Sequence, residues 1–266
     1  MALPEETSSH RCWRAATERH LHSRPYHARS VMAVHPSTAV QNRLLASLPA
    51  DTLAALAPNL DPVVLRLRQQ LYDPDTRIEW VYFVESGMVS LVSNMEDGSR
   101  AEVGVIGYED VLGVSLLSGI DTPYVEAMVQ LPGKALRMGT SAFLHAVDTN
   151  TVFRQLLLRH AEALQAQIMQ TAACNGRHDL EQRFARWLLM AHDRAGSKDL
   201  PLTQEFMAIM LGVQRTSITA VASILHKAGI IDYRAGKLKL LDRALLEAAC
   251  CECYDVVCRR YTLLLG

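Results

Sequence analysis

The sequence predicts an α+β chain in which an N-terminal antiparallel β-roll, of the jelly-roll or double-stranded β-helix type, precedes one long helix and a small helical domain with a β-hairpin. Three observations predict this order. Short apolar runs separated by turn residues fill 62–137, one long helical period covers about 143–174, and two shorter helical patterns with a paired apolar run follow.

These changes of pattern divide the 266 residues into five parts. We expect a disordered tail or a mis-annotated start at 1–38, with Met32 as the alternative first residue, because clear helical amphipathicity begins only after it. The β-roll is expected at 39–142, a long dimerisation helix at 143–175, the C-terminal domain with its hairpin at 176–250, and a helical tail at 251–266.

Composition excludes several classes of protein. No apolar stretch reaches the 18–20 residues or so that cross a bilayer, and no export signal opens the chain, so a cytoplasmic protein is expected. The totals of 27 basic and 28 acidic side chains give no sign of a polyanionic partner. However, 42–150 holds 7 basic against 14 acidic residues, whereas 175–243 holds 11 against 7. This asymmetry suggests that the C-terminal part faces a polyanion.

The predicted roll consists of short strands joined by turns. Val63, Leu65 and Leu67 alternate with Val64, Arg66 and Arg68. The apolar runs 80–84 and 88–92 flank Ser86-Gly87. Asp97-Gly98 is a hairpin signal, because both residues tolerate positive φ. Strands at this spacing are typical of an antiparallel barrel or roll.

The long helix carries one apolar stripe with steps of three and four residues. It could pack on its own roll or on the same helix of a second copy, and its two small residues would allow close approach of two helices. Asn175-Gly176 is the predicted end of the helix, and Asp179 is predicted to cap the next one. The stripe consists of Leu157, Ala161, Leu164, Ile168 and Ala172.

The segment 203–229 has the pattern of a helix-turn-helix. Thr203 is a good N-cap for a first helix over 204–210, Gly212 can take the left-handed conformation of the turn, and a second helix follows over 214–227. The alternative is an ordinary pair of packed helices. The apolar residues predicted between the helices are Met207, Leu211, Val213, Ile218 and Val221.

With those residues buried, the second helix presents a short polar face that suits a DNA major groove. Arg215 can donate two hydrogen bonds to guanine, and Gln214 can pair with adenine or reach a phosphate. A hairpin over 230–240 forms a basic wing for flanking phosphates. The predicted DNA-binding residues are Thr203, Gln204, Gln214, Arg215, Thr216, Ser217, Thr219, Ala220, Arg234 and Lys237.

From about Ala39 to Tyr254 this order resembles the Crp/Fnr family of bacterial transcription regulators, with matching residues at Thr203-Gln204-Glu205, Leu211-Gly212-Val213 and Arg215. The resemblance implies a cyclic-nucleotide-binding-like sensory roll and a homodimer on the long helix. It also implies a two-fold symmetric DNA operator and RNA polymerase as a further partner.

The chain departs from the nucleotide-binding members of that family. Val114 stands where their acidic residue is expected, and no Lys or Arg occurs between Arg100 and Lys134. A buried phosphate without a cation is costly, so binding of cyclic AMP or cyclic GMP is not expected. Within the second helix, Thr216 and Ala220 replace charged base readers, which predicts a different operator. The candidates for an effector pocket are Gly107, Glu109, Gly113, Val114 and Tyr124.

The remaining candidate chemistry is sparse. The thiols at Cys250, Cys251, Cys253 and Cys258 match no strong zinc signature, so neither a metal nor another cofactor is expected; a metal or redox site at Cys250 and Cys253 is the alternative. No P-loop, HExxH, G-x-S-x-G or GxGxxG motif occurs, so an enzyme is not expected. A regulatory module that acts on a protein partner is a third possibility, which the basic wing disfavours.

Overall fold

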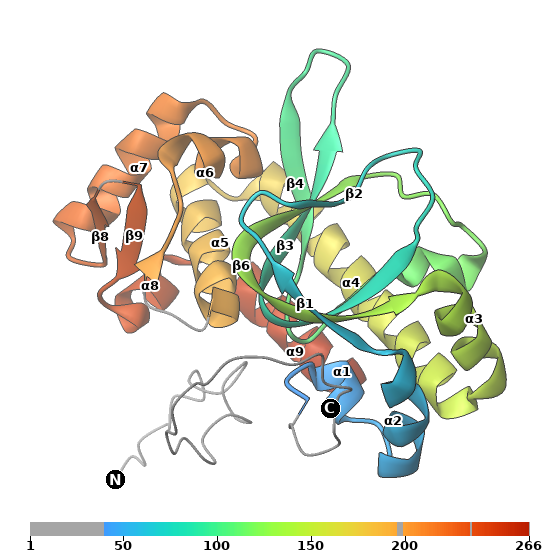
Figure 1. The fold of residues 1–266 in the computed structure, drawn as a ribbon. Helices are drawn as coiled ribbons and strands as arrows, with labels where there is room; N and C mark the ends of the chain where they lie inside the picture. The colour runs from blue at the N-terminus through green and yellow to red at the C-terminus, as the bar shows by residue number, and fades with distance from the viewer. Residues whose placement is uncertain (1–39, 196–198, 235, 266) are drawn as a thin grey trace, which may run out of the picture.

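The structure, a computed structural model, describes residues 40–195, 199–234 and 236–265 (Figure 1). The expected tail at 1–38 and the alternative start at Met32 lie outside this part of the chain. The antiparallel roll, the long helix and the C-terminal helix-turn-helix confirm the predicted fold class.

The roll is one antiparallel sheet in which β3 pairs with β4, β5 and β6. Its strands are β1 (Asp61–Leu65), β2 (Gln70–Tyr72), β3 (Trp80–Asn94), β4 (Arg100–Ile106), β5 (Val111–Leu112) and β6 (Glu126–Gly139).

The two runs predicted at 80–84 and 88–92 are a single strand, β3. Between them the register with β6 shifts, and Gly87 has a φ of +86°, so Ser86-Gly87 forms an irregularity within β3 and no turn. Gly98, with a φ of +81°, does lie in the turn between β3 and β4.

Short helices flank the roll at both ends of the sheet. Before it lie α1 (Arg43–Ala46), α2 (Ala50–Leu56) and the 3-10 turn η2 (Ala57–Asn59), and η3 (Val114–Ser118) follows β5. Aliphatic and aromatic side chains fill the core of this part, among them Val81, Phe83, Val89, Ile106 and Val129.

The long helical pattern is divided into α3 (Thr140–Thr149) and α4 (Thr151–Arg177). The single helix predicted from residue 143 is therefore wrong, because Asn150 adopts an extended backbone and its side chain accepts the N–H of Phe153 at 2.9 Å as an N-cap. The helix ends at Arg177, one residue after the predicted Asn175-Gly176, and His178 is extended. The last backbone bond, from the His178 N–H to the Cys174 carbonyl, is 3.0 Å long, and Asp179 accepts the N–H of Gln182 in the next helix.

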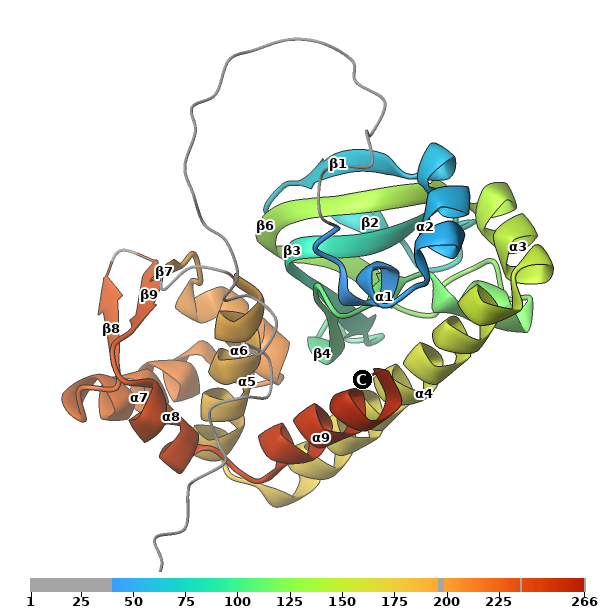
Figure 2. The same ribbon diagram turned by 90° about the horizontal axis from the view of Figure 1, so that it is seen from below.

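The C-terminal domain contains α5 (Leu180–Ala195), β7 (Asp199–Leu200), α6 (Gln204–Leu211), α7 (Arg215–Lys227), β8 (Ile231–Arg234), β9 (Lys237–Leu240) and α8 (Arg243–Ala249). Its last helix, α9 (Cys253–Leu265), leaves the domain and lies beside α4 in both ribbon views (Figure 2). One apolar cluster joins Met88, Val92 and Val105 of the roll to α5, α6 and α7. The two domains therefore share a core.

Candidate nucleic-acid interface

The turn between α6 and α7 has the geometry of a helix-turn-helix. The two helices meet at 108°, and Gly212 between them has a φ of +63°, a value that favours glycine. Thr203 caps α6, since its hydroxyl accepts the N–H of Phe206 at 3.2 Å. No single helix in the described ranges is long and apolar enough to cross a membrane; α6 and α7 pass that test only as a bent pair.

The space between the two helices is filled by apolar side chains. Met207 and Ile218 are fully buried, Leu211 and Val221 nearly so, and Val213 is half-buried. These are the residues that the sequence places in the interior. Their burial fixes which side of α7 is left to solvent.

The free side of α7 is its N-terminal half. Gln214, Arg215, Thr216, Thr219 and Ala220 are exposed. Ser217, which the sequence also assigns to this face, is half-buried. A row of short polar side chains with one arginine is therefore exposed at the start of α7, directly after the turn that follows α6.

Two of the predicted DNA-binding residues are engaged within the domain. The hydroxyl of Thr203 serves as the cap of α6, and the side-chain oxygen of Gln204 accepts a hydrogen bond from the Thr219 hydroxyl at 2.9 Å. The N–H of Gln204 also bonds the hydroxyl of Tyr233 in the wing, at 3.2 Å. These hydrogen bonds connect α6, α7 and β8, so Gln204 and Thr219 have a structural role within the domain.

The wing consists of β8 and β9, with β7 pairing on the outer side of β9. Arg234 is largely exposed, and its Nε lies 3.3 Å from the carboxylate of Asp232. Lys237 is exposed at the start of β9, next to Gly236. Two cations thus stand at the turn of the hairpin, one of them already beside a carboxylate.

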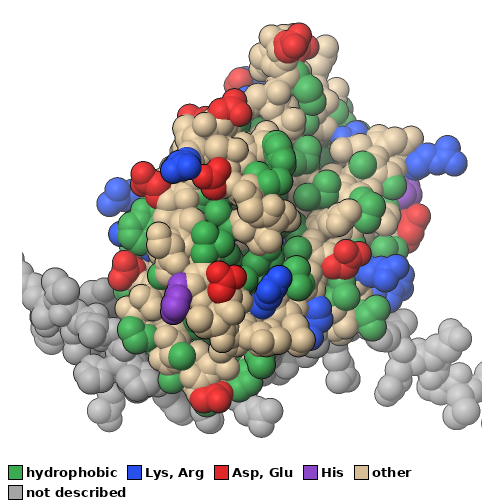
Figure 3. Space-filling view, turned by 90° about the vertical axis from the view of Figure 1, so that its right-hand side faces the viewer, with side chains coloured by type: hydrophobic (Ala, Val, Ile, Leu, Met, Phe, Trp, Pro, Cys, Tyr) green, Lys and Arg blue, Asp and Glu red, His purple; other side chains and the backbone are tan. Residues whose placement is uncertain are grey.

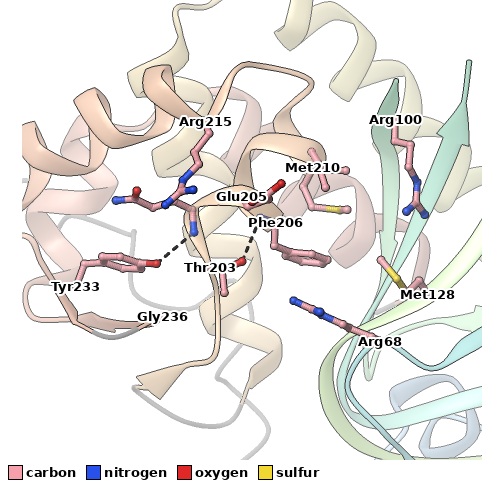
Figure 4. Close-up of a pocket in the computed structure, with 12 residues that line it drawn as sticks. Arg68, Arg100, Met128, Thr203, Glu205, Phe206, Met210, Arg215, Tyr233 and Gly236 are labelled. Carbon is pink, nitrogen blue, oxygen red and sulfur yellow. Dashed lines mark hydrogen bonds between the residues drawn. The ribbon is translucent and has the colours of Figure 1, made fainter. Parts of the chain in front are cut away.

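A pocket of about 820 Å³ lies between the helix-turn-helix and the roll (Figure 4). Arg215 lines it from the start of α7, and Arg68 and Arg100 line it from the roll. Arg100 forms an ion pair with Glu126. Neither Arg68 nor Arg100 belongs to a recognisable sequence motif. Only the packing of the domains shows that they line the same pocket as Arg215.

A buried carboxylate connects the roll to α5. Glu102 of β4 accepts hydrogen bonds from the Trp187 indole N–H at 2.9 Å and from the Ser90 hydroxyl at 2.5 Å. Burial raises the pKa of Glu102 from 4.5 to about 7, although both hydrogen bonds and the nearby Arg186 and Arg194 favour its charged form. The charge state of this joint therefore changes near neutral pH.

The five candidates for an effector pocket have different surroundings in the structure. Glu109 forms a buried ion pair with Arg194 of α5, and Gly107 lies against both side chains. Gly113 instead packs beside Tyr72, Val114 is half-buried at the roll core, and Tyr124 is 79% exposed. That these residues line an effector pocket stays a prediction.

Much of the predicted dimer stripe packs inside its own chain. Leu157 and Leu164 are buried in the core of the roll, and Ile168 packs against it. Ala161 is half-buried and Ala172 is exposed. The sequence allowed this stripe to pack either on its own roll or on the same helix of a second copy. Three of its first four residues pack on the roll. A neighbouring face of α4, which shares Ala172 with the predicted stripe, is exposed; we call it the α4 outer stripe, and it consists of Leu158, Glu162, Gln165, Met169 and Ala172.

Residues that could hold a metal lie at the junction of α4 and α9. The thiols of Cys174, Cys251 and Cys253 and the ring of His178 gather there. Cys250 does not join them; its thiol donates to the Cys251 carbonyl at 3.2 Å. The alternative site predicted at Cys250 and Cys253 is thus wrong about Cys250, since Cys253 lies with Cys174, His178 and Cys251 instead. The sequence could not indicate Cys174 and His178, because they are distant in sequence and only the fold brings them close to Cys253.

The helix-turn-helix region also matches a known family. The family model described as the Crp-like helix-turn-helix domain matches residues 182–249. No curated protein matches the chain.

Several solved structures share the fold over 70–73% of this chain. FixK2 from Bradyrhizobium japonicum is 20% identical, with a TM-score of 0.61 over 72% of this chain and 98% of that one. TTHB099, a transcriptional regulator of the CRP family from Thermus thermophilus, is 20% identical, with a TM-score of 0.60 over 70% and 95%. CLP of Xanthomonas campestris, a c-di-GMP responsive global regulator, is 16% identical, with a TM-score of 0.60 over 73% and 100%.

Proposed function

Residues 182–249 are a Crp-like helix-turn-helix domain within a chain that has the fold of Crp/Fnr regulators; on this basis we propose that the protein binds a two-fold symmetric DNA operator as a homodimer and regulates transcription. The observation that carries the proposal is the exposed polar N-terminal half of α7, with Arg215 at its first position. A helix of this kind enters the major groove with its N-terminal residues toward the bases.

The exposed residues of α7 and of the wing contact different parts of the DNA. Arg215 reads a guanine through two hydrogen bonds, while Gln214 and Thr216 contact a neighbouring base or phosphate. Lys237 and Arg234 of the wing lie on flanking phosphates. Thr219 is shared, because its hydroxyl is already held by Gln204, and it contacts DNA through its methyl group.

We infer that the α4 outer stripe is the seam of the homodimer. Its exposed positions recur with steps of four and three residues from Leu158 to Ala172, which is the repeat of a two-helix coiled coil. Leu158 and Met169 are each about half exposed, although both are large and apolar. In such a homodimer the two α7 helices must lie on successive turns of the DNA, about 34–36 Å apart.

We also propose that the roll does not grip a cyclic nucleotide. The acidic side chain of Glu109 is committed to Arg194 in the joint between the domains, so it does not offer its charge to a ribose within the roll. Val114 packs against the apolar core in place of an acidic residue. Calorimetric titration with cyclic AMP and cyclic GMP should show no binding at micromolar concentrations; heat of binding in that range would contradict the proposal.

Selection of bound sequences from random duplex DNA tests the function itself. We expect enrichment of an inverted repeat whose half-sites lie one helical turn apart, with affinity that falls steeply as salt rises. Mobility shift with the enriched and a scrambled duplex then measures specificity. An absence of enrichment, or equal affinity for both duplexes at all salt concentrations, would exclude a sequence-specific regulator.

A further inference from the structure

Four metal-binding side chains converge where the long helix ends and the last helix begins. Cys174 lies in the last turn of α4, and His178 directly follows that helix. Cys251 lies between α8 and α9, and Cys253 is the first residue of α9. One ligand atom from each, three Sγ atoms and one imidazole nitrogen, all lie within 4.8 Å of one another. This group is independent of the helix-turn-helix.

The distances within the group suit one tetrahedral ion. The Sγ atoms of Cys174 and Cys251 are 3.6 Å apart, and the Cys253 Sγ is 3.5 Å from Nδ1 of His178. With metal–sulfur and metal–nitrogen bonds of about 2.3 and 2.0–2.1 Å, the edges of a tetrahedron are about 3.8 Å between two sulfurs and about 3.5 Å between sulfur and nitrogen. A [4Fe–4S] cluster would separate the ligand sulfurs further, since each of them binds a different iron.

The surroundings of the ligands also resemble those of a metal site. Nε2 of His178, the ring nitrogen remote from Cys253, lies 3.2 Å from the carboxylate of Glu252. Such a carboxylate fixes the orientation of a ligating imidazole and raises its basicity. The side-chain amide of Gln170 donates to the Cys253 Sγ at 3.0 Å, as expected beside a thiolate. All three cysteines are buried, which limits competition by water.

We propose that Cys174, His178, Cys251 and Cys253 bind one Zn²⁺ in a closed tetrahedral site. Three thiolates and one imidazole are a set that zinc uses in structural sites, where no position is left open for catalysis. The ion would join the end of α4 to the start of α9. It therefore holds α9 along α4, where Tyr261 reaches the buried Asp110 and Gln167 with hydrogen bonds of 2.8 and 2.9 Å.

Metal content and a cobalt spectrum test the site in the full chain. Protein purified under reducing conditions should contain one zinc per chain by mass spectrometry. After exchange for Co²⁺, the visible bands should indicate tetrahedral geometry, and the thiolate-to-cobalt band should have the intensity of three thiolates. The spectrum is measured on the unmodified chain, so this part of the test does not depend on the folding of a variant.

Paired cysteine variants then assign the ligands. Cys251→Ser should lose at least tenfold in zinc affinity, whereas Cys250→Ser, one residue away and outside the group, should retain one zinc. Hydrogen exchange over 253–265 should accelerate when the metal is removed from the unmodified chain.

Three outcomes would overturn the site. They are iron with inorganic sulfide in place of zinc, no binding of added Zn²⁺ by the reduced chain, and equal zinc loss in Cys250→Ser and Cys251→Ser.

Discussion

Arg215 combines an exposed guanidinium with the first position of the exposed helix α7. Because a bidentate contact to guanine contributes about 1–3 kcal/mol, Arg215→Ala should weaken operator binding by about 5- to 150-fold and relax one position in each half-site. Mobility shift on the selected operator measures the loss. Arg259→Ala, which removes an exposed arginine of α9, is the control and should bind normally. Unchanged binding by Arg215→Ala would show that α7 is docked differently.

Glu102 makes the stability of the chain depend on pH. Its pKa rises from 4.5 to about 7 on folding, so the folded chain binds the proton more tightly and Glu102 stabilises it most at low pH. That stability is lost as pH rises from about 4.5 through 7, by up to about 3 kcal/mol. Glu102→Gln should remove this loss, so its stability relative to the natural chain should increase between pH 5 and 8.

Urea unfolding at several pH values measures that difference. Glu96→Gln, in the exposed turn between β3 and β4, is the matched control and should follow the natural chain at every pH. A constant difference between Glu102→Gln and the natural chain would mean that the Glu102 carboxyl is equally protonated in the folded and unfolded chain.

At the scale of elements, α4 serves two surfaces at once. Its inner face is buried against the roll and α9, and its outer stripe is left exposed. Met169→Glu places a charge on that stripe and, in a symmetric pair, close to the same charge of the partner. We expect dimerisation to weaken by tenfold or more, about 1.4 kcal/mol.

Light scattering across a range of concentrations measures this equilibrium. Leu263→Glu changes an even more exposed apolar residue, on α9 and away from the stripe, and should leave the dimer intact. If Met169→Glu dimerises as the natural chain does, the seam lies elsewhere.

The path of α4 also shows where local signals compete. The sequence predicts a helix end at Asn175-Gly176 but none at Asn150. Asn150 ends α3 and caps α4 through the N–H of Phe153, and α4 itself ends at Arg177, after which Asp179 accepts the N–H of Gln182 in α5. The sequence pattern misses the break at Asn150 because the apolar period continues across it, whereas the end near Gly176 has a local glycine signal.

At the scale of the whole molecule, the roll and the C-terminal domain should unfold as one unit. Their apolar cluster runs from Met88 and Val105 to α5 without interruption, and Trp187 joins Glu102 across the boundary. We expect the urea transitions followed by tryptophan fluorescence and by far-ultraviolet circular dichroism to coincide. Separate midpoints would mean that the shared core contributes little to stability.

The distribution of charge belongs to the same scale. The roll is acidic and the C-terminal domain is basic, although the whole chain is close to neutral. Figure 3 shows acidic and basic side chains intermingled on one face of the molecule, with acidic ones at the tip of the projecting hairpin. A neutral total therefore does not exclude DNA as a partner, because the basic domain alone presents α7.

The sequence by itself determined the order of the elements and the exposed face of α7. Both follow from local patterns, since the spacing of Met207, Ile218 and Val221 dictates which side of each helix is buried. The resemblance to Crp/Fnr regulators depends on residues of the same segment, at 203–205, 211–213 and Arg215. Arg215, predicted as a base reader, is therefore also exposed where a groove would meet it.

Only the tertiary structure decided which distant residues meet. Arg194 forms an ion pair with Glu109, and Arg68 lines the same pocket as Arg215. Cys174 and His178 meet Cys251 and Cys253, which lie more than seventy residues further along the chain. It also turned Leu157 and Leu164 toward the roll and left Leu158 and Met169 outside. The period of apolar residues along a helix shows that one stripe is buried, but it does not show which surface covers the stripe. Both the roll and a second helix offer an apolar surface of the same kind.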